Sequence, residues 1–266
     1  MTESEYSSMW GIYSGKFKLL TTAPIAISSA LSTAIIPSLV RSYTTGNKRE
    51  IKYKIDSTIK LSMLVAIPCG MGLSILGLPV ISLLFRDVTN PEVYKTIMYF
   101  SVFTVVFYSL STITNSVLQG VDKMRMPVIN ALISLVVHIP LLLVLLFVFK
   151  LDVYAVVIAD FIFALFVCVL NNIALRKYIK YTMDFVNVIL KPFLAAIVMA
   201  LLTLVTYKLF MNITNMNSIS TIFAILVAMV IYFVILLLLK SVTEEELGMI
   251  PKGYMLVKLC KKIGLM

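Results

Sequence analysis

The sequence has few charged residues. Only 14% of its 266 residues are Asp, Glu, Lys or Arg, whereas 60% are hydrophobic. A soluble domain carries about 25% charged and about 45–50% apolar residues. The scarcity of charge therefore excludes an ordinary soluble protein, and the mean hydropathy of +0.99 indicates a chain that crosses a membrane several times.

Side chains that commonly carry chemistry are also scarce. The chain has one histidine, and its three cysteines, Cys69, Cys168 and Cys260, show no CxxC or metal-ligand spacing, so we interpret them as packing residues rather than disulfides. There is no HExxH motif, no P-loop, no Ser–His–Asp arrangement with supporting glycines and no carboxylate pair in a plausible active-site setting. We therefore expect neither an enzyme nor a bound cofactor or metal.

Long apolar stretches dominate what is present. A membrane-spanning helix needs about 20 mostly apolar residues. Unpaired strands cannot cross a bilayer, because their backbone groups would lack hydrogen-bond partners. The sequence thus predicts an all-α, polytopic membrane protein with about seven transmembrane helices, at residues 19–40, 61–85, 97–118, 127–149, 153–175, 190–210 and 219–239.

The basic residues lie mainly in alternate loops. The net charge of +10 would suggest nucleic acid in a soluble protein, but here it indicates membrane topology and anionic lipid headgroups. Lys and Arg concentrate in residues 41–60, 123–125, 176–191 and beyond 240. The positive-inside rule places these segments in the cytoplasm, so the N-terminus lies outside.

An outside N-terminus without a signal peptide, on an odd number of helices, is typical of a chain that lacks preceding helices. We therefore expect the C-terminal half of a larger protein. A seven-helix retinal protein is disfavoured, because residues 219–239 contain no lysine for a Schiff base.

Two basic segments have amphipathic patterns. In 41–60, Ile51, Ile55 and Ile59 recur every four residues while the lysines point elsewhere, which predicts an interfacial helix. In 240–266, Thr243 followed by three glutamates predicts a helix start, and a basic amphipathic helix follows Pro251. We expect both segments to anchor to anionic headgroups.

Two titratable residues stand inside expected spans. His138 and Asp160 lie about 18 Å and about 14 Å from the turn between their helices, near the midplane of a roughly 30 Å core. We expect them to be able to pair. Such a pair is either a protonation or ion-coupling site or a hydrogen bond that locks the hairpin.

Small polar residues mark two helices. The first helix carries Ser28 and Ser32, and the third carries a stripe on one face. Such a stripe either lines a water-filled cavity or hydrogen-bonds across the bundle, and we favour the cavity. Prolines inside the spans are expected to act as hinges. The stripe comprises Ser101, Thr104, Tyr108, Thr112, Asn115 and Gln119, and the prolines are Pro24, Pro37, Pro68, Pro79 and Pro140.

Two short motifs carry a resemblance to a known family. One is Gly11-x-Tyr13-x-Gly15-Lys16, with Pro24 and then Ile36-Pro37-Ser38-Leu39. The other is Leu118-Gln119-Gly120, a short basic loop, and Pro127-Val128-Ile129-Asn130. They resemble the eighth helix and the tenth-to-eleventh connection of flippases in the multidrug/oligosaccharidyl-lipid/polysaccharide exporter superfamily. The closest likeness is to the branch of polysaccharide biosynthesis, stage V sporulation protein B and lipid II flippase-like proteins.

The resemblance implies helices eight to fourteen of a fourteen-helix transporter in the bacterial plasma membrane. Residues 1–18 would be an extracytoplasmic start, 19–175 a five-helix C-terminal lobe, 190–239 two accessory helices beside a groove for a prenyl tail, and 240–266 a cytoplasmic tail. The substrate would be a polyprenyl-diphosphate-linked oligosaccharide or peptidoglycan precursor, moved by alternating access. The residues assigned to the diphosphate and cavity are Lys16, Lys18, Ser28, Ser32, Tyr108, Thr112, Asn115 and Gln119.

Two alternatives stay open. The first is a cation-coupled multidrug antiporter of the same superfamily, in which His138 and Asp160 are the coupling pair. The second is a non-transporting membrane scaffold, a half-protein that pairs with a separate N-terminal half or with a second copy of itself.

Overall fold

The computed structural model describes residues 3–85, 90–239 and 241, and within these ranges every regular element is a helix. Seven helical stretches are long and apolar enough to cross a membrane. This confirms the all-α fold with about seven membrane spans. The stretches are Tyr6–Thr44, Lys48–Leu84, Ser101–Gly120, Arg125–Val148, Asp152–Ile179, Val186–Thr214 and Asn217–Leu238.

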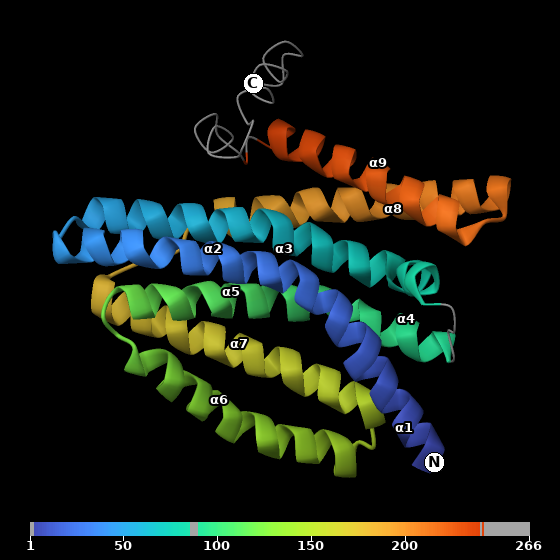
Figure 1. Ribbon diagram of the computed structural model, residues 1–266, viewed down its shortest axis with the longest axis horizontal. Helices are drawn as coiled ribbons and strands as arrows, with labels where there is room; N and C mark the ends of the chain where they lie inside the picture. The colour runs from blue at the N-terminus through green and yellow to red at the C-terminus, as the bar shows by residue number, and fades with distance from the viewer. Residues whose placement is uncertain (1–2, 86–89, 240, 242–266) are drawn as a thin grey trace. The chain divides into compact units, whose positions relative to one another are not determined.

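The chain forms two compact units, Met1–Met183 and Asp184–Met266 (Figure 1). The second contains η3 (Val186–Leu190), α8 (Lys191–Thr214) and α9 (Asn217–Leu238). The first contains α1 (Glu3–Gly11), η1 (Ile12–Phe17), α2 (Lys18–Thr44), α3 (Lys48–Leu84), α4 (Pro91–Tyr99), α5 (Ser101–Gly120), α6 (Arg125–Leu143), η2 (Val144–Val148) and α7 (Asp152–Ile179).

Helix α5 is the centre of the first unit. It packs against α2, α3 and α7, whereas α6 packs mainly against α7 (Figure 1). Of the residues in the most apolar stretch of each span, 56% are buried in α5, compared with 6% in the span Arg125–Val148 that α6 and η2 form. The polar face of α5 therefore meets other helices, and the Leu, Ile and Val side chains of α6 form an exposed apolar surface suited to lipid.

Small residues let α3 and α5 approach closely. A Cβ atom on Gly70 would lie 2.9 Å from the Cα atom of Val102. The Ser101 hydroxyl donates to the Gly70 carbonyl at 3.0 Å. Close packing of backbones, with a polar link between them, is the usual way helices associate in a membrane.

The turn between α2 and α3 is short and capped. Gly46, with φ +68°, adopts the left-handed conformation that glycine tolerates best. The Asn47 side chain then accepts from the Glu50 backbone N–H at 3.2 Å and caps α3.

The structure corrects the expected interfacial position of the amphipathic helix predicted in residues 41–60. Residues 48–60 are the first turns of α3, and Ile51, Ile55 and Ile59 are buried against the protein instead of facing headgroups. The first membrane span also begins earlier than expected, since residues 3–44 are helical without a break and include residues 3–18 of the predicted start. The expected span 97–118 is interrupted at Phe100, between α4 and α5.

The predicted amphipathic tail, 240–266, lies almost wholly outside the described residues.

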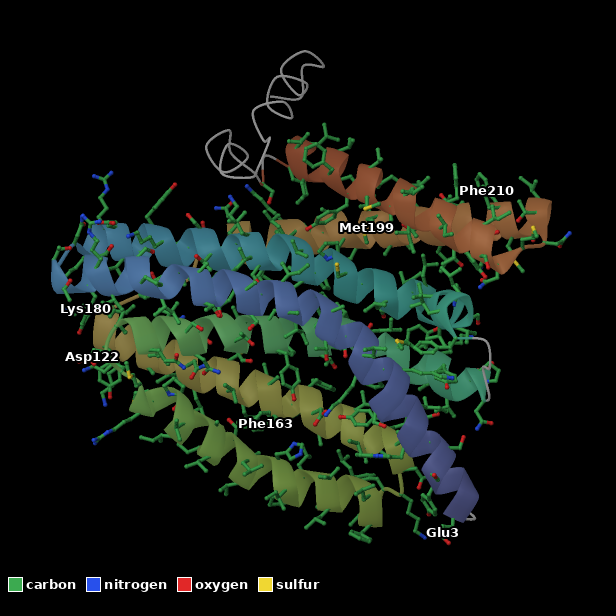
Figure 2. All side chains as sticks on the ribbon, viewed as in Figure 1. Glu3, Asp122, Phe163, Lys180, Met199 and Phe210 are labelled. Carbon is green, nitrogen blue, oxygen red and sulfur yellow. The ribbon has the colours of Figure 1, made fainter. Side chains whose placement is uncertain are left out.

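The second unit is a helical hairpin. Helices α8 and α9 run side by side, and Asn215, with φ 51°, ends α8. The rings of Phe210 and Phe223 stack at 4.0 Å between centroids, and the Tyr207 hydroxyl donates to Asn217 at 2.9 Å (Phe210 is labelled in Figure 2).

Candidate functional site

A π-helical segment, η1, joins α1 to α2. The backbone N–H of Lys18 donates to the carbonyl oxygen of Tyr13, five residues earlier. In an α-helix, residues five apart lie about 140° apart around the axis. The i→i+5 bonding of a π-helix instead places them nearly one above the other. Tyr13 and Lys18 are thus brought to the same side of the helix.

Both side chains reach Asp160 on α7. The Tyr13 hydroxyl donates to Asp160 Oδ2, and Lys18 Nζ lies 3.6 Å from the same oxygen. The Lys18 ammonium also lies 5.1 Å from the centre of the Tyr13 ring. Tyr108 on α5 is near enough to interact electrostatically with Asp160 and Tyr13. We call these four residues, Tyr13, Lys18, Tyr108 and Asp160, the Asp160 cluster.

Exposure differs sharply across the Asp160 cluster. The Asp160 side chain is 18% exposed, whereas that of Lys18 is 54% exposed. A buried carboxylate is costly unless it is paired and hydrogen-bonded, and here Tyr13 and Lys18 meet both needs. The cluster therefore holds an accessible ammonium group beside a mostly buried carboxylate.

Lys16 has different surroundings. It is half-buried, and its Nζ lies 4.8 Å from the centre of the Tyr94 ring and 5.4 Å from that of Phe85. Cation–π contacts of this kind hold a lysine with its charge beside aromatic faces. The two lysines assigned to the diphosphate therefore contact different side chains, although Lys16 lies in η1 and Lys18 lies only two residues later, at the start of α2.

The expected His138–Asp160 pair does not form. A His138 ring nitrogen lies 3.1 Å from the carbonyl oxygen of Ala159, and the ring meets Phe163 edge-on at 5.7 Å (Phe163 is labelled in Figure 2). His138 therefore binds the backbone of the residue before Asp160, while the Asp160 side chain turns to Tyr13 and Lys18. A coupling role for His138 or Asp160 stays a prediction.

Ser28 and Ser32 are buried between helices. The hydroxyl groups of Ser28 and Ser62 lie 2.6 Å apart, and those of Ser32 and Ser116 lie 2.9 Å apart. These bonds join α2 to α3 and to α5. The geometry at Ser28 and Ser32 is that of cross-bundle hydrogen bonding, the alternative to the cavity that the sequence favoured.

The stripe on α5 has several environments. Tyr108 belongs to the Asp160 cluster, Thr112 donates to the Tyr108 carbonyl at 2.8 Å, and Gln119 is exposed. Asn115 accepts from Asn171 on α7 at 2.7 Å. The stripe therefore does not act as one surface, and the substrate-binding roles of its residues stay predictions.

Sequence reasoning missed an asparagine network. Asn171 donates to Asn115 and, at 3.0 Å, to Thr114, and it accepts from Asn130 on α6 at 2.8 Å. We call these four residues the Asn171 network. The signal available was that amide side chains at membrane depth are costly and need partners. The predicted hinge prolines all stand inside helices, Pro24 and Pro37 in α2, Pro68 and Pro79 in α3 and Pro140 in α6, and their hinge role stays a prediction.

Comparison with known proteins adds to this geometry. A family model described as "Lipid II flippase MurJ" matches residues 17–229, which is most of the chain. The chain belongs to the MurJ lipid II flippase family. This confirms the predicted membership of the exporter superfamily. The family consists of multi-pass transporters of the bacterial inner membrane, not of enzymes.

Two curated relatives from the MurJ family match parts of the chain. The lipid II flippase MurJ of Bacillus subtilis (strain 168) is 25% identical over 123 residues, which are 46% of this chain and 23% of that protein. The probable lipid II flippase MurJ of Bdellovibrio bacteriovorus is 26% identical over 225 residues, which are 81% of this chain and 42% of that protein. The chain thus spans less than half the length of these relatives.

Proposed function

We propose that this chain is the C-terminal part of a transporter that carries a polyprenyl-diphosphate-linked sugar, such as a peptidoglycan precursor, across the bacterial plasma membrane. The family match over residues 17–229 carries the proposal. Transport proceeds by alternating access, without covalent chemistry. The chain spans 42% of the Bdellovibrio relative, so in this proposal it supplies one lobe of the transport pathway.

Lys18 is the principal diphosphate ligand in this proposal, and Lys16 assists from the same segment. The Lys18 ammonium is the more accessible of the two, and its distance of 3.6 Å from Asp160 is longer than a hydrogen bond. A diphosphate carries more charge than one carboxylate and offers several acceptor oxygens, so it can replace Asp160 as the partner of Lys18.

Tyr13 makes this exchange less costly. When Lys18 turns to the substrate, Asp160 keeps the hydrogen bond from the Tyr13 hydroxyl. The mostly buried carboxylate therefore keeps one partner. An unpaired buried carboxylate would cost roughly several kcal/mol. The Asp160 cluster thus supports binding and release of an anion without loss of local structure.

Orientation follows from the loop charges. We propose that the turn between α2 and α3 faces the cytoplasm and that the start of α2, with Lys16 and Lys18, lies toward the outer side. The second unit, with many exposed apolar side chains on α8 and α9, would hold the prenyl tail.

Binding to the purified full chain in nanodiscs tests the diphosphate site. The probe is farnesyl diphosphate, with farnesol as the uncharged comparison. We expect Lys18→Ala to weaken diphosphate binding roughly tenfold, because one charge-assisted hydrogen bond is worth about 1.5–3 kcal/mol, and Lys16→Ala to weaken it less. Lys95→Ala, an exposed lysine on α4, is the matched control.

If wild-type protein binds the diphosphate and both lysine variants bind it equally well, the assigned residues are wrong. Transport is tested separately in proteoliposomes that contain the chain alone or with a co-expressed N-terminal half of a MurJ relative. Lipid-linked sugar that crosses the bilayer in neither case would refute the proposed function.

A further inference from the structure

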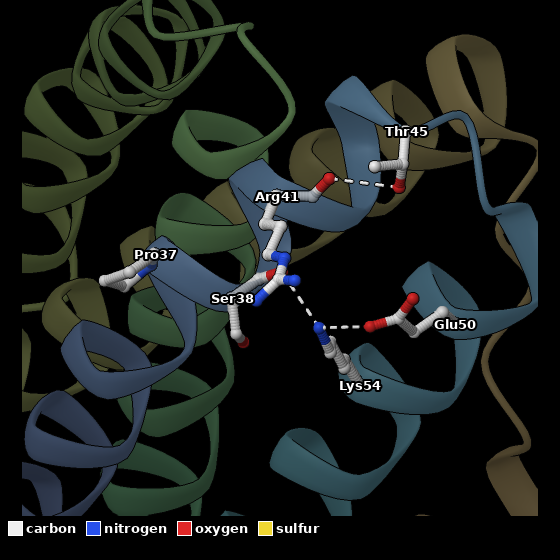
Figure 3. Close-up of a pocket in the computed structure, with 6 residues that line it drawn as sticks. All are labelled: Pro37, Ser38, Arg41, Thr45, Glu50 and Lys54. Atoms are coloured by element: carbon white, nitrogen blue, oxygen red, sulfur yellow. Dashed lines mark hydrogen bonds and ion pairs between the residues drawn. The ribbon is translucent and has the colours of Figure 1, made fainter.

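A cavity of about 670 Å³ opens at the end of the α2–α3 hairpin (Figure 3). It lies about 30 Å along α2 from Lys18, since Lys18 and Ser38 are twenty residues apart in one helix. It is therefore separate from the Asp160 cluster. We call it the α2–α3 pocket, and its lining residues are Pro37, Ser38, Arg41, Thr45, Glu50 and Lys54.

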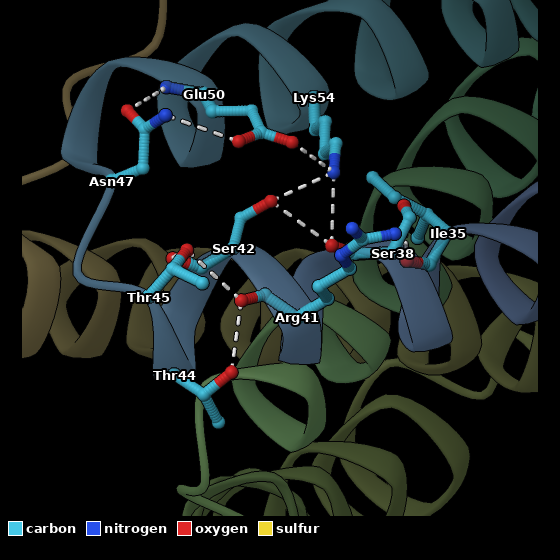
Figure 4. A network of polar contacts seen from close by, with 9 residues as sticks. All are labelled: Ile35, Ser38, Arg41, Ser42, Thr44, Thr45, Asn47, Glu50 and Lys54. Atoms are coloured by element: carbon cyan, nitrogen blue, oxygen red, sulfur yellow. Dashed lines mark hydrogen bonds and ion pairs between the residues drawn. The ribbon is translucent and has the colours of Figure 1, made fainter.

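Lys54 forms a fixed wall of the α2–α3 pocket. Its Nζ donates to the Ser38 carbonyl at 2.9 Å and to the Ser42 hydroxyl at 2.7 Å, and it lies 2.6 Å from Glu50 Oε1 (Figure 4). An ammonium group has three N–H donors, so these partners use all of them. The Lys54 side chain, 23% exposed, thus ties α3 to the last turns of α2.

Arg41 is different. Thr44 and Thr45 bond only its backbone carbonyl, at 2.9 Å and 3.1 Å. Its guanidinium forms no hydrogen bond or ion pair with any residue that the structure describes. Figures 3 and 4 show the Arg41 and Lys54 side chains reaching from two helices toward the same gap.

The charges at the α2–α3 pocket favour an anion. Two cations meet one carboxylate, that of Glu50, and Glu50 is engaged by Lys54. Lys48, Arg49 and Lys52 lie exposed on the adjoining turns of α3 and add to the positive potential. A guanidinium offers five donors in a planar fork that matches two phosphate oxygens.

We propose that the α2–α3 pocket binds a phosphate group through the Arg41 guanidinium, and that the phosphate belongs to an anionic lipid headgroup. The position supports this source, because the pocket lies where two long apolar helices end and a basic surface begins. Basic residues at such ends attract anionic headgroups. The inference is independent of the diphosphate site.

Glu50 limits the affinity of this site. Its carboxylate lines the same cavity and repels a phosphate, while it also holds Lys54. Glu50→Gln removes the negative charge but keeps an oxygen that can accept from Lys54. The change should therefore strengthen phosphate binding without opening the hairpin.

Native mass spectrometry of the delipidated full chain tests the site. Dioleoylphosphatidylglycerol is titrated against dioleoylphosphatidylcholine, and inorganic phosphate is tested in a separate arm. We expect preferential retention of phosphatidylglycerol, weakened roughly tenfold by Arg41→Gln and strengthened several-fold by Glu50→Gln. The matched control is Lys48→Gln, an exposed cation on the same hairpin that does not line the cavity.

The phosphate site would be overturned if Arg41→Gln bound both probes as well as wild type, or if Lys48→Gln lost as much affinity as Arg41→Gln. Binding of inorganic phosphate that requires Arg41, without preference for phosphatidylglycerol, would confirm the phosphate site and reject the lipid source. Arg41→Lys keeps the charge but lacks the planar fork, so it should bind with intermediate affinity even if Arg41→Gln proves poorly folded. Arg41→Lys that binds as wild type would contradict recognition by the guanidinium fork.

Discussion

The backbone N–H of Lys18 donates to the carbonyl oxygen of Tyr13, and the side chains of both residues then contact one oxygen of Asp160. The π-helical turn between Tyr13 and Lys18 brings their side chains to the same side of the helix, so both can reach Asp160. Single π-helical turns occur often at functional sites. Here the turn places a hydroxyl donor and an ammonium group on a carboxylate in another helix, 142 or more residues away in the chain.

Tyr13→Phe is expected to lower the free energy of unfolding in detergent by about 1–3 kcal/mol, because a mostly buried carboxylate loses a donor. Asp160→Asn should make the loss of the hydroxyl less costly, so a double-mutant cycle should give a coupling energy of about 1 kcal/mol or more. Both values are measured by titration with a denaturing detergent.

Tyr99→Phe is the control for this cycle, since Tyr99 is 50% exposed on α4. A Tyr13→Phe variant as stable as the Tyr99→Phe variant, with no coupling to Asp160→Asn, would show that the hydroxyl contributes nothing to the cluster.

Gly70→Ala should separate α3 from α5. Its Cβ would lie 2.9 Å from the Cα atom of Val102, and a backbone atom cannot move aside as a flexible side chain can. We expect a loss of about 1–3 kcal/mol in the free energy of unfolding. Gly72→Ala is the matched control on the same helix, because nothing lies within 4 Å of its added Cβ. Equal stability of the two variants would contradict the close approach of α3 and α5.

The spans could be predicted from the sequence because hydropathy and length suffice to identify helices of this size. The burial of Ile51, Ile55 and Ile59 could not. Their spacing of four predicts an apolar helix face, but the same face fits lipid or protein. Only the packing of α3 decides between them.

The side chains that contact Asp160 could not be predicted from the sequence either. Depth along each helix predicted correctly that His138 and Asp160 lie at similar levels, since His138 bonds the carbonyl of Ala159. The rotation of each helix about its own axis decides which side chains meet. One π-helical turn in η1 shifts that rotation for Tyr13 relative to Lys18, and the hydrophobic pattern carries no signal of it.

The stability of the first turn of η3 should depend on pH through the Asp184 carboxylate. Hydrogen bonds from the Asn187 side chain, and from its backbone N–H at 3.2 Å, hold the pKa of Asp184 below its usual range. A lowered pKa means that the ionised cap stabilises the helix fully above the unfolded pKa and loses its effect as pH falls through the folded value. Carboxyl-carbon NMR should report the low pKa, and the Asn187 amide should lose protection over the same acid range.

Asp184→Asn keeps a side-chain acceptor but cannot ionise. Protection of the Asn187 amide should then be independent of acid pH. If the amide in this variant still loses protection as the wild type does, Asp184 is not the titrating group.

Asn171 joins three helices of the first unit through its single side chain. It donates to Thr114 and Asn115 on α5 and accepts from Asn130 on α6. Asn171→Ala leaves these groups without their partner inside the bundle, and we expect a loss of about 1–3 kcal/mol in the free energy of unfolding. The adjacent Asn172, which is only half-buried, provides the control, and Asn172→Ala should change stability by less than about 0.5 kcal/mol. The Asn171 network connects α6 to the rest of the unit. Amide hydrogen exchange in α6 should therefore become faster in Asn171→Ala but not in Asn172→Ala. Equally fast exchange in both variants would mean that the loss of any polar side chain at this depth has the same effect.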